Sequence, residues 1–240
     1  MEREKFEEIL TGYLKEIHIE LNQKQILQFY QYMELLIEWN QKINLTAITE
    51  PHEIILKHFV DSLTIEKEIK KGAVIVDIGT GAGFPGIPLK IYRKDIKIIL
   101  VDSLNKRLNF LNEVIKILKL EKIETIHSRA EEFGRNKKYR EKFDIATSRA
   151  VANLATLSEY LIPLVKEGGK CICMKGSDVK EELEKSKKAI FVLGGKICDI
   201  NDFSLPNTDM KRNIITIKKI EKTPSKYPRK PGLPAKEPIS

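Results

Sequence analysis

Cysteine and histidine are scarce in this chain. The three cysteines, Cys171, Cys173 and Cys198, are too few for a disulfide framework, which fits a reducing, cytoplasmic location. Each lies within a short apolar run, so we predict that all three are small core residues rather than nucleophiles or metal ligands. The four histidines show no ligand spacing either, and the sequence therefore predicts no metal site.

Long apolar runs and an export signal are also missing. No stretch approaches the ~18 consecutive apolar residues that a membrane-spanning helix needs. The opening MEREKFEEIL alternates charges where a signal peptide has an apolar segment, so we do not expect export. Hydrophobic residues make up 42% and charged residues 32% of the 240 residues, which is typical of a globular protein. We expect one large domain with a smaller attachment, no membrane contact, and a monomer.

Positive charge exceeds negative charge, and the excess is concentrated towards the C-terminus. Lys and Arg number 42 against 34 Asp and Glu, which leaves a net charge of +8. From Lys218 onwards seven basic residues stand against two acidic ones, so this stretch carries five of the eight excess charges. Proline and tyrosine interrupt the charges in KTPSKYPRKPGLPAK, which favours a nucleic acid partner over a tail that only aids solubility.

Several basic residues are candidate RNA contacts. They are Arg135, Lys137, Lys138, Lys175, Lys226, Arg229 and Lys230. Contacts to phosphates would make the affinity depend strongly on salt while carrying little sequence information. Each residue is equally well explained as part of a solvated loop or tail.

The first seventy residues have helical periodicity. Apolar residues recur at spacings of three and four over residues 23–40, and a second helix is predicted to begin between Thr49 and Pro51. We interpret Trp39 and His58 in these helices as packing residues rather than as a base-stacking platform and a catalytic group. Residues 1–70 are therefore predicted to form a helical cap.

From residue 71 the pattern changes to strands that alternate with helices. The predicted strands are AVIVD, KIILVD, IETIH, FDIAT, KCICM, KICDI and NIITIKKI. The alternation predicts an α/β fold with a mostly parallel sheet covered on both faces, and the short LPNTDMKR linker predicts a C-terminal antiparallel hairpin. We expect this domain to span residues 71–220. A basic Pro/Lys-rich tail, residues 221–240, is expected to lie extended over a surface or to stay mobile.

A glycine-rich loop follows the first predicted strand. Residues 77–83 read DIGTGAG, with Gly79, Gly81 and Gly83 at alternate positions and Asp77 ahead of them. Glycine permits a tight turn and lets a ligand approach the backbone closely. The loop therefore favours a bound cofactor over a strand–helix turn without a ligand.

The spacing of the glycines and two prolines narrow the choice of cofactor. Dinucleotide-binding loops have the spacing G-x-G-x-x-G and hold pyrophosphate at the N-terminus of the following helix. Here the spacing is G-x-G-x-G, and Pro85 and Pro88, which have no N–H to donate, stand at the helix entry. S-adenosylmethionine has no phosphate, so the loop favours it and disfavours an NAD-dependent oxidoreductase.

Two further strand ends carry candidate cofactor residues. Asp102, followed by Ser103 and Leu104, ends the second predicted strand, where an acid either accepts hydrogen bonds from ribose hydroxyls or caps the next helix. Ala130 and Glu131 follow the third strand, where they could meet the adenine edge. Glu131 is equally explained as an acid in the first turn of a helix.

Arg149 ends the fourth predicted strand in the segment Thr147-Ser148-Arg149-Ala150, beside the first strand, where an open sheet has its ligand crevice. An arginine in a buried crevice needs an anion. The anion is a carboxylate or phosphate of a ligand, or a neighbouring acid such as Asp77 or Asp102 in a structural ion pair.

Several of these segments together resemble one protein family. DIGTGAGFPGIPL, VDSLNKR, SRAVANL, the amino-terminal WNQKINLTAI and the tail KYPRKPGLPAKEPI are similar to the bacterial ribosomal RNA small subunit methyltransferase G family, also called glucose-inhibited division protein B. The resemblance covers nearly the whole chain. It implies a Rossmann-like class I fold, S-adenosylmethionine as cofactor, and methylation of guanine N7 in 16S ribosomal RNA, as naked RNA or in the small-subunit particle. It also implies cofactor contacts at Gly79, Phe84, Asp102, Ser103, Leu104, Ala130, Glu131 and Arg149, with Asp77, Gly81 and Gly83 as secondary contacts.

The residues themselves permit this chemistry. Guanine N7 has a free lone pair and no proton to lose, so its methylation needs alignment and electrostatic help, for which Arg149 is a candidate, but no general base. The Asn/Asp-Pro-Pro-aromatic tetrad usual for exocyclic amines is replaced by SRAV, and no cysteine is predicted to act as the nucleophile that pyrimidine C5 requires. The alternatives are another RNA or a small molecule as acceptor, or a non-catalytic RNA-binding protein on a methyltransferase fold.

Overall fold

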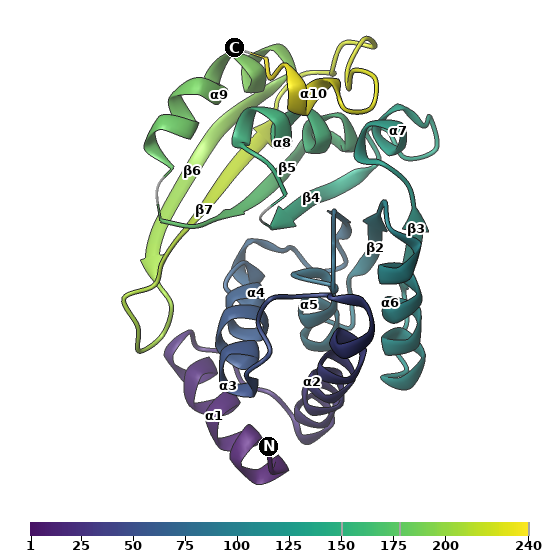
Figure 1. Ribbon diagram of the computed structural model, residues 1–240. Helices are drawn as coiled ribbons and strands as arrows, with labels where there is room; N and C mark the ends of the chain where they lie inside the picture. The colour runs from purple at the N-terminus through teal and green to yellow at the C-terminus, as the bar shows by residue number, and fades with distance from the viewer. Residues whose placement is uncertain (150, 178, 240) are drawn as a thin grey trace.

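A seven-stranded sheet lies at the centre of the computed structural model, which describes residues 1–149, 151–177 and 179–239 (Figure 1). The strands are β1 Val74–Ile78, β2 Lys97–Asp102, β3 Ile123–His127, β4 Phe143–Arg149, β5 Val165–Lys175, β6 Gly195–Ser204 and β7 Lys211–Lys219. Their order is β3-β2-β1-β4-β5-β7-β6. β7 pairs antiparallel with β5 and β6, and the other neighbours pair in parallel. The predicted sheet and its C-terminal hairpin are therefore confirmed.

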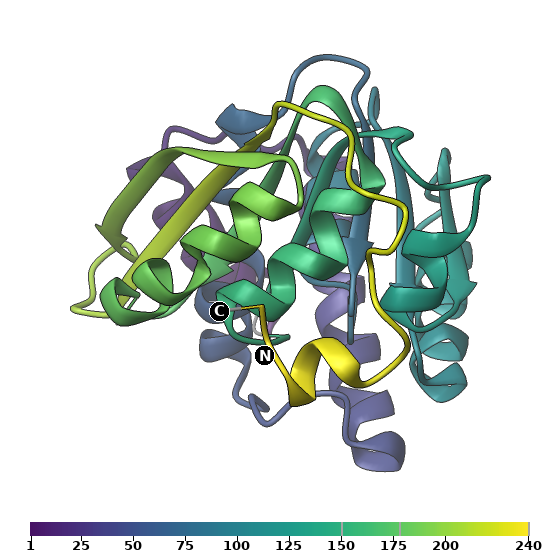
Figure 2. The ribbon, with the colours of Figure 1, turned by 90° about the horizontal axis from the view of Figure 1, so that it is seen from above.

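Helices cover both faces of the sheet. Successive side chains of each strand point to opposite faces, so each face presents apolar side chains that pack against helices in a separate hydrophobic cluster. Ile75 and Ile98 point into the first cluster, whereas Val76 and Ile99 point into the second. The first cluster includes helices α1 Arg3–Glu16, α2 Gln23–Ile43, α3 Pro51–Ile54, α4 Asp61–Leu63, α5 Gly86–Tyr92 and α6 Asn105–Ile117. The second includes α7 Ala130–Arg135, α8 Leu154–Leu161 and α9 Lys180–Val192, and Figure 2 shows α8 and α9 side by side.

The first seventy residues are helical, as predicted. α2 begins with a capping box, in which Asn22 and Gln25 each accept a hydrogen bond from the other's backbone N–H (3.0 and 2.9 Å). α3 and α4 are joined by a π-helical turn, Ile55–Val60, so the chain is helical without a break from residue 51 to residue 63. These helices share the first hydrophobic cluster with the sheet, and the domain boundaries at residues 70 and 220 stay a prediction.

The residues after β7 lie along the surface beside α7 and α8 and include the short helix α10, Leu233–Lys236 (Figure 2). Tyr227 and Pro228 in this segment are buried, while Lys226 and Lys230 are exposed. Of the two expectations for the tail, the structure therefore agrees with an extended course over a surface. In the described parts of the chain, no helix combines the length and the apolar character needed to cross a membrane.

One cysteine departs from its prediction. Cys171 and Cys173 are buried in the second cluster, but Cys198 is exposed, so its assignment to the core is wrong. β6 is an edge strand whose pairing register shifts between Ile197 and Asp199, which makes Cys198 the extra residue of a bulge. Most residues of this edge strand are exposed, so the apolar run around Cys198 did not imply that the residue is buried.

Phe59 is the centre of an aromatic cluster in the first hydrophobic cluster. Its ring is fully buried, and its centroid lies 5.1 Å from that of Phe29 and 5.3 Å from that of Tyr32. Replacing the ring by a methyl group leaves a cavity that the surrounding side chains fill only partly. We therefore expect Phe59→Ala to lower the free energy of unfolding by about 3–5 kcal/mol in urea denaturation. Phe191→Ala is the control, since that side chain is 77% exposed, and it should change the value by less than about 0.5 kcal/mol. Equal effects of the two substitutions would show that the cluster does not stabilise the fold.

Candidate functional site

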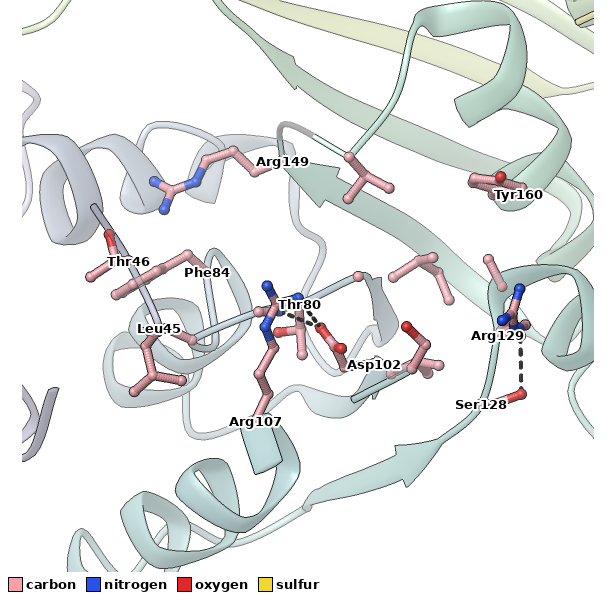
Figure 3. Close-up of a pocket in the computed structure, with 18 of the residues that line it drawn as sticks. Leu45, Thr46, Thr80, Phe84, Asp102, Arg107, Ser128, Arg129, Arg149 and Tyr160 are labelled. Atoms are coloured by element: carbon pink, nitrogen blue, oxygen red, sulfur yellow. Dashed lines mark hydrogen bonds and ion pairs between the residues drawn. The ribbon is translucent and has the colours of Figure 1, made fainter. Parts of the chain in front are cut away.

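A cleft of about 620 Å³ opens at the carboxyl ends of β1 to β4. Its size is typical of small-molecule sites, and its place beside β1 is the ligand crevice of an open α/β sheet. It is lined by Leu45, Thr46, His58, Ile78, Gly79, Thr80, Gly81, Ala82, Phe84, Val101, Asp102, Ser103, Arg107, Ser128, Arg129, Ala130, Glu131, Arg149, Val151, Tyr160 and Gly232. Figure 3 shows the two ends of this cleft. The end that we call the Arg149 end also contains Leu45, Thr46 and Phe84, and the end that we call the Tyr160 end also contains Ser128 and Arg129. Asp102 lies between the two ends (Figure 3).

Two glycines of the loop between β1 and α5 are required by space as well as by backbone geometry. Gly79 has φ +65°, and a Cβ there would lie 2.7 Å from a methyl carbon of Val151. Gly83 has φ +99°, and its Cβ would lie 2.8 Å from the hydroxyl oxygen of Tyr32. A larger residue at either position would strain the backbone and clash with these side chains.

The carboxylate at the end of β1 holds the start of α5. One Asp77 oxygen accepts hydrogen bonds from the Thr80 hydroxyl (2.7 Å) and from the Gly86 amide (3.0 Å). Complete burial raises the pKa of Asp77 to about 7, although both hydrogen bonds favour the ionised form. The other oxygen of Asp77 is buried without a hydrogen-bond partner among the described residues.

The carboxylate at the end of β2 holds the glycine loop itself. Asp102 accepts hydrogen bonds from the amides of Gly81 (2.9 Å) and Leu104 (3.0 Å), and Arg107 lies 3.3 Å from the same oxygen that binds Gly81. A carboxylate offers about four lone-pair positions, so Asp102 keeps acceptor capacity towards the cleft that it lines.

These contacts leave no phosphate cradle at the entry to α5. The amide of Gly86 is occupied by Asp77, and the amide of Ile87 donates to the carbonyl of Gly83 (2.7 Å). The Asp102 carboxylate also places negative charge beside the loop, which would repel a pyrophosphate. The geometry therefore suits a cofactor without phosphates.

The N-terminal helices brace the opposite side of the loop. The hydroxyl of Tyr32 donates a short hydrogen bond to the carbonyl of Ala82, and its ring packs 5.5 Å from that of Phe84, centroid to centroid. Burial raises the pKa of Tyr32 well above its ordinary value, so the hydroxyl stays a donor. α2 is thereby joined to the wall of the cleft.

Arg149 is held by the segment that joins α3 to α4. Its guanidinium donates to the carbonyl of Lys57 (2.9 Å) and to Nδ1 of His58 (2.8 Å), and it lies 3.3 Å from the Asp61 carboxylate. The sequence suggested Asp77 or Asp102 as the ion-pair partner. The structure provides Asp61 instead, which comes from a helix 88 positions away in the sequence.

The Arg149 end is positively charged. Asp61 also accepts from Arg212 at 3.2 Å, so one carboxylate serves two guanidinium groups and the three side chains together carry one net positive charge. The Arg149 guanidinium carbon lies 4.9 Å from the ring centroid of Phe84, which faces it as a cation–π partner. This end of the cleft can therefore accept an anionic group of a ligand.

His58 contributes more than packing. Because arginine can only donate, Nδ1 of His58 accepts from Arg149, and Nε2–H then donates to the Thr46 hydroxyl oxygen (2.9 Å). Burial, followed by the nearby Arg149 charge, lowers the pKa of His58 to about 3, so the ring is neutral. It also stacks on Phe84 at 4.3 Å, centroid to centroid. His58 thus connects the cleft rim at Thr46 to Arg149.

The Tyr160 end combines a carboxylate, a phenol and the C-terminal segment. Glu131, in the first turn of α7, is buried and accepts a hydrogen bond from the amide of Gly232 (2.8 Å). Burial, then the negative charges of Glu131 and Glu159, raises the pKa of Tyr160 to about 12. Its hydroxyl therefore remains a donor at neutral pH.

Most of the residues singled out from the sequence meet in this one cleft. Those that line it are Gly79, Gly81, Phe84, Asp102, Ser103, Ala130, Glu131 and Arg149. Asp77 and Gly83 lie behind the lining, and Leu104 contributes its amide to Asp102 while its side chain is exposed. Ala150 lies outside the described residues.

Sequence reasoning missed several lining residues. They are Leu45, Thr46, His58, Arg107, Ser128, Arg129, Val151, Tyr160 and Gly232. Some had a signal, because Leu45 and Thr46 lie in WNQKINLTAI, Arg107 in VDSLNKR and Gly232 in the tail motif. Tyr160 lay within a helical pattern with nothing to distinguish it from a packing residue.

Five of the seven candidate RNA contacts are exposed: Arg135, Lys137, Lys138, Lys226 and Lys230. Three of the seven have partners within the protein: Arg135 donates to the Pro228 carbonyl, Lys175 to the Ala152 carbonyl and Glu182, and Arg229 to Glu159. RNA binding by these residues stays a prediction. No cluster of three or more potential metal ligands occurs within residues 1–149, 151–177 and 179–239.

Comparison of sequences identifies close relatives. Residues 25–215 match the family model described as rRNA small subunit methyltransferase G. A protein named ribosomal RNA small subunit methyltransferase G from Desulforamulus reducens is 56% identical over 228 residues, which cover 94% of this chain and 95% of that protein. The similarity thus covers nearly the whole chain.

Comparison of structures shows the fold alone. A SAM-dependent methyltransferase from Aquifex aeolicus has a TM-score of 0.54 and 16% identity over 72% of this chain and 96% of its own. The [4+2]-cyclase SpnF has a TM-score of 0.56 and 14% identity over 82% of this chain and 97% of its own. Since proteins named for different reactions share this fold, function has to be argued from the cleft and the sequence family.

The buried Asp77 predicts a specific pH dependence. Its pKa in the folded protein is higher than in the unfolded chain. Between about pH 4 and pH 7 the folded protein therefore holds a proton on Asp77 that the unfolded chain releases. The protonated Asp77 stabilises the fold at low pH, and this stabilisation is lost as the pH rises to 7. Asp77→Asn keeps an oxygen acceptor and cannot ionise. We expect the free energy of unfolding of this variant, relative to the wild type, to increase by a few kcal/mol from pH 5 to pH 8 in urea denaturation.

Asp199→Asn is the matched control, because Asp199 also lies on a strand but is exposed. Its stability relative to the wild type should be the same at both pH values. A constant difference between Asp77→Asn and the wild type would contradict the raised pKa of Asp77.

Proposed function

The chain belongs to the ribosomal RNA small subunit methyltransferase G family, and from this premise we propose that it transfers a methyl group from S-adenosylmethionine to N7 of a guanine in 16S ribosomal RNA. The observation that carries the proposal is the cleft at the ends of β1 to β4. In this cleft Asp102 lies between a positively charged end and an end that contains Glu131 and Tyr160. An acid at the end of the second strand is where doubly wound folds bind ribose, which supports the proposal.

The lining residues fit the parts of this cofactor. S-adenosylmethionine, when bound, supplies an electrophilic methyl group on a sulfonium centre. Asp102 has acceptor capacity left for the ribose hydroxyls, and Ala130 and Glu131 stand where an adenine edge would be read. Arg149, whose charge is only partly balanced by Asp61, suits the cofactor's carboxylate. Gly79, Phe84, Ser103 and Leu104 complete the proposed contacts.

The choice of N7 is supported by the absence of a free base at the Arg149 end. Among the described lining residues there, the titratable side chains are His58 and Arg149. His58 has both ring nitrogens in hydrogen bonds and a pKa of about 3, so it cannot accept a proton at neutral pH. An acceptor that loses no proton, such as guanine N7, needs only alignment and electrostatic stabilisation.

The remaining parts of the proposal concern the protein's setting. We propose that it acts in the cytoplasm as a monomer on 16S ribosomal RNA or the small-subunit particle. The net charge of +8 favours a polyanionic partner, and Lys137, Lys138, Lys226 and Lys230 offer exposed positive charge for phosphates.

The function is tested by incubating the protein with S-adenosylmethionine and unmodified 16S ribosomal RNA, or unmodified small-subunit particles, and mapping methylated nucleotides by mass spectrometry. We expect one guanine to become 7-methylguanosine. The same RNA without protein is the control. Methyl on another atom, on a small molecule or on the protein alone would contradict the proposed acceptor.

Substitution of Asp102 tests the cofactor site. Asp102→Ala removes the ribose acceptor and releases the Gly81 amide, so we expect the affinity for S-adenosylmethionine to fall roughly 10- to 100-fold in calorimetry, as for loss of one hydrogen bond to a charged group. Asp144→Ala is the control, because Asp144 also accepts a backbone N–H, that of Val74, but does not line the cleft. Unchanged affinity in Asp102→Ala would place the cofactor elsewhere.

A further inference from the structure

Arg229 anchors the C-terminal segment to α8 through Glu159. The guanidinium of Arg229 donates to both carboxylate oxygens of Glu159 (3.0, 3.1 and 2.7 Å), and the Arg229 backbone amide donates to the same carboxylate (2.6 Å). Glu159 is fully buried in α8. A bidentate contact of this kind fixes both position and orientation, and removal of Arg229 would leave a buried carboxylate with fewer partners.

Further contacts hold the rest of the segment in place. Arg140 donates to the carbonyls of Thr223 (2.8 Å) and Tyr227 (2.6 Å), on the N-terminal side of the anchor. On its C-terminal side, the hydroxyl of Thr156 donates to the carbonyl of Pro234 (3.0 Å). The segment is therefore fixed by side chains of the main fold on both sides of Arg229.

Three residues beyond the anchor, the segment reaches the cleft. Gly232 lines the Tyr160 end, and its amide donates to Oε1 of Glu131 at 2.8 Å. Glu131 is itself a buried lining residue and follows Ala130 in the first turn of α7. Glu159, which holds the anchor, is followed directly by Tyr160 at the same end of the cleft. The anchored segment thus determines where one lining carboxylate is held.

We propose that residues 227–234 form a fixed wall of the cofactor site, and that Arg229 is a positioning residue that acts on the cofactor through Gly232 and Glu131. The inference rests on the proposed function, since it assumes that the cleft binds S-adenosylmethionine. It assigns to Arg229 a role in the cofactor site in place of a contact with RNA phosphates. The neighbouring Lys226 and Lys230, whose side chains are exposed, remain available to RNA.

The test compares Arg229→Ala with Lys230→Ala in the full chain. Both substitutions remove one positive charge from the same segment, but only Arg229 contacts Glu159. We expect Arg229→Ala to weaken binding of S-adenosylmethionine about tenfold in calorimetry, and to raise KM for the cofactor while KM for RNA is unchanged. Lys230→Ala should leave both cofactor values within about twofold of the wild type.

Arg229→Lys keeps the charge and the backbone hydrogen bond to Glu159 but loses the planar fork. Arg229→Lys replaces Arg229→Ala in the test if the alanine variant does not fold. Its affinity for S-adenosylmethionine should lie between that of the wild type and that of Arg229→Ala. Thermal unfolding of each variant without cofactor, recorded alongside, separates stability from binding because affinities are measured well below the unfolding temperature.

The outcomes are distinguishable. If the wild type binds no S-adenosylmethionine, the proposed function fails. If the wild type binds S-adenosylmethionine and both Arg229 variants bind it as tightly as the wild type, the inference is overturned while the proposed function stands. This holds even where the unfolding temperature of the variants is lowered, because Arg229 then only stabilises the fold. If Arg229→Ala raises KM for RNA alone and makes RNA binding less dependent on salt, Arg229 is a phosphate contact. That result would also overturn the inference.

Discussion

The amides of the glycine loop and of the start of α5 must be hydrogen-bonded, and the carboxyls at the ends of β1 and β2 bind one amide of each. Asp77 accepts from Gly86 and Asp102 accepts from Gly81. An unpaired amide in this position would cost about 1–3 kcal/mol, so the two acids determine the path of the loop. The cleft depends on them, because the backbone that they hold forms one of its walls.

The same contacts also select the ligand. A loop whose first helical amide is already bound by a carboxyl cannot cradle a pyrophosphate, whereas Asp102 can still accept from hydroxyls. The two ends of the cleft then come from opposite ends of the chain. The N-terminal helices supply His58 and hold Arg149, and the C-terminal segment supplies Gly232 next to Glu131. The cleft thereby has a positively charged end at Arg149 and a second end that contains Glu131 and Tyr160.

Sequence reasoning succeeded where one local rule decided the outcome. Short apolar runs that alternate with helical patterns predicted every strand of the described sheet, and the parallel arrangement brought Asp102 beside the glycine loop. It failed where a local irregularity or a distant partner intervened. Cys198 is exposed because it lies in a bulge of the edge strand β6, most of which is exposed. Arg149 pairs with Asp61 because a helix from the first seventy residues lies against the end of β4.

The sequence by itself determined the fold class, the glycine loop, the acids at the ends of the first two strands, and the family. Each of these is read from short segments whose residues are close together in the chain. Only the tertiary structure decided the partner of Arg149, the role of His58 and the position of the C-terminal segment. His58 and Arg149 lie 91 positions apart, and Glu131 and Gly232 lie 101 positions apart. Hydrogen bonds over such separations form only when whole elements pack together, and neither periodicity nor spacing carries information about them.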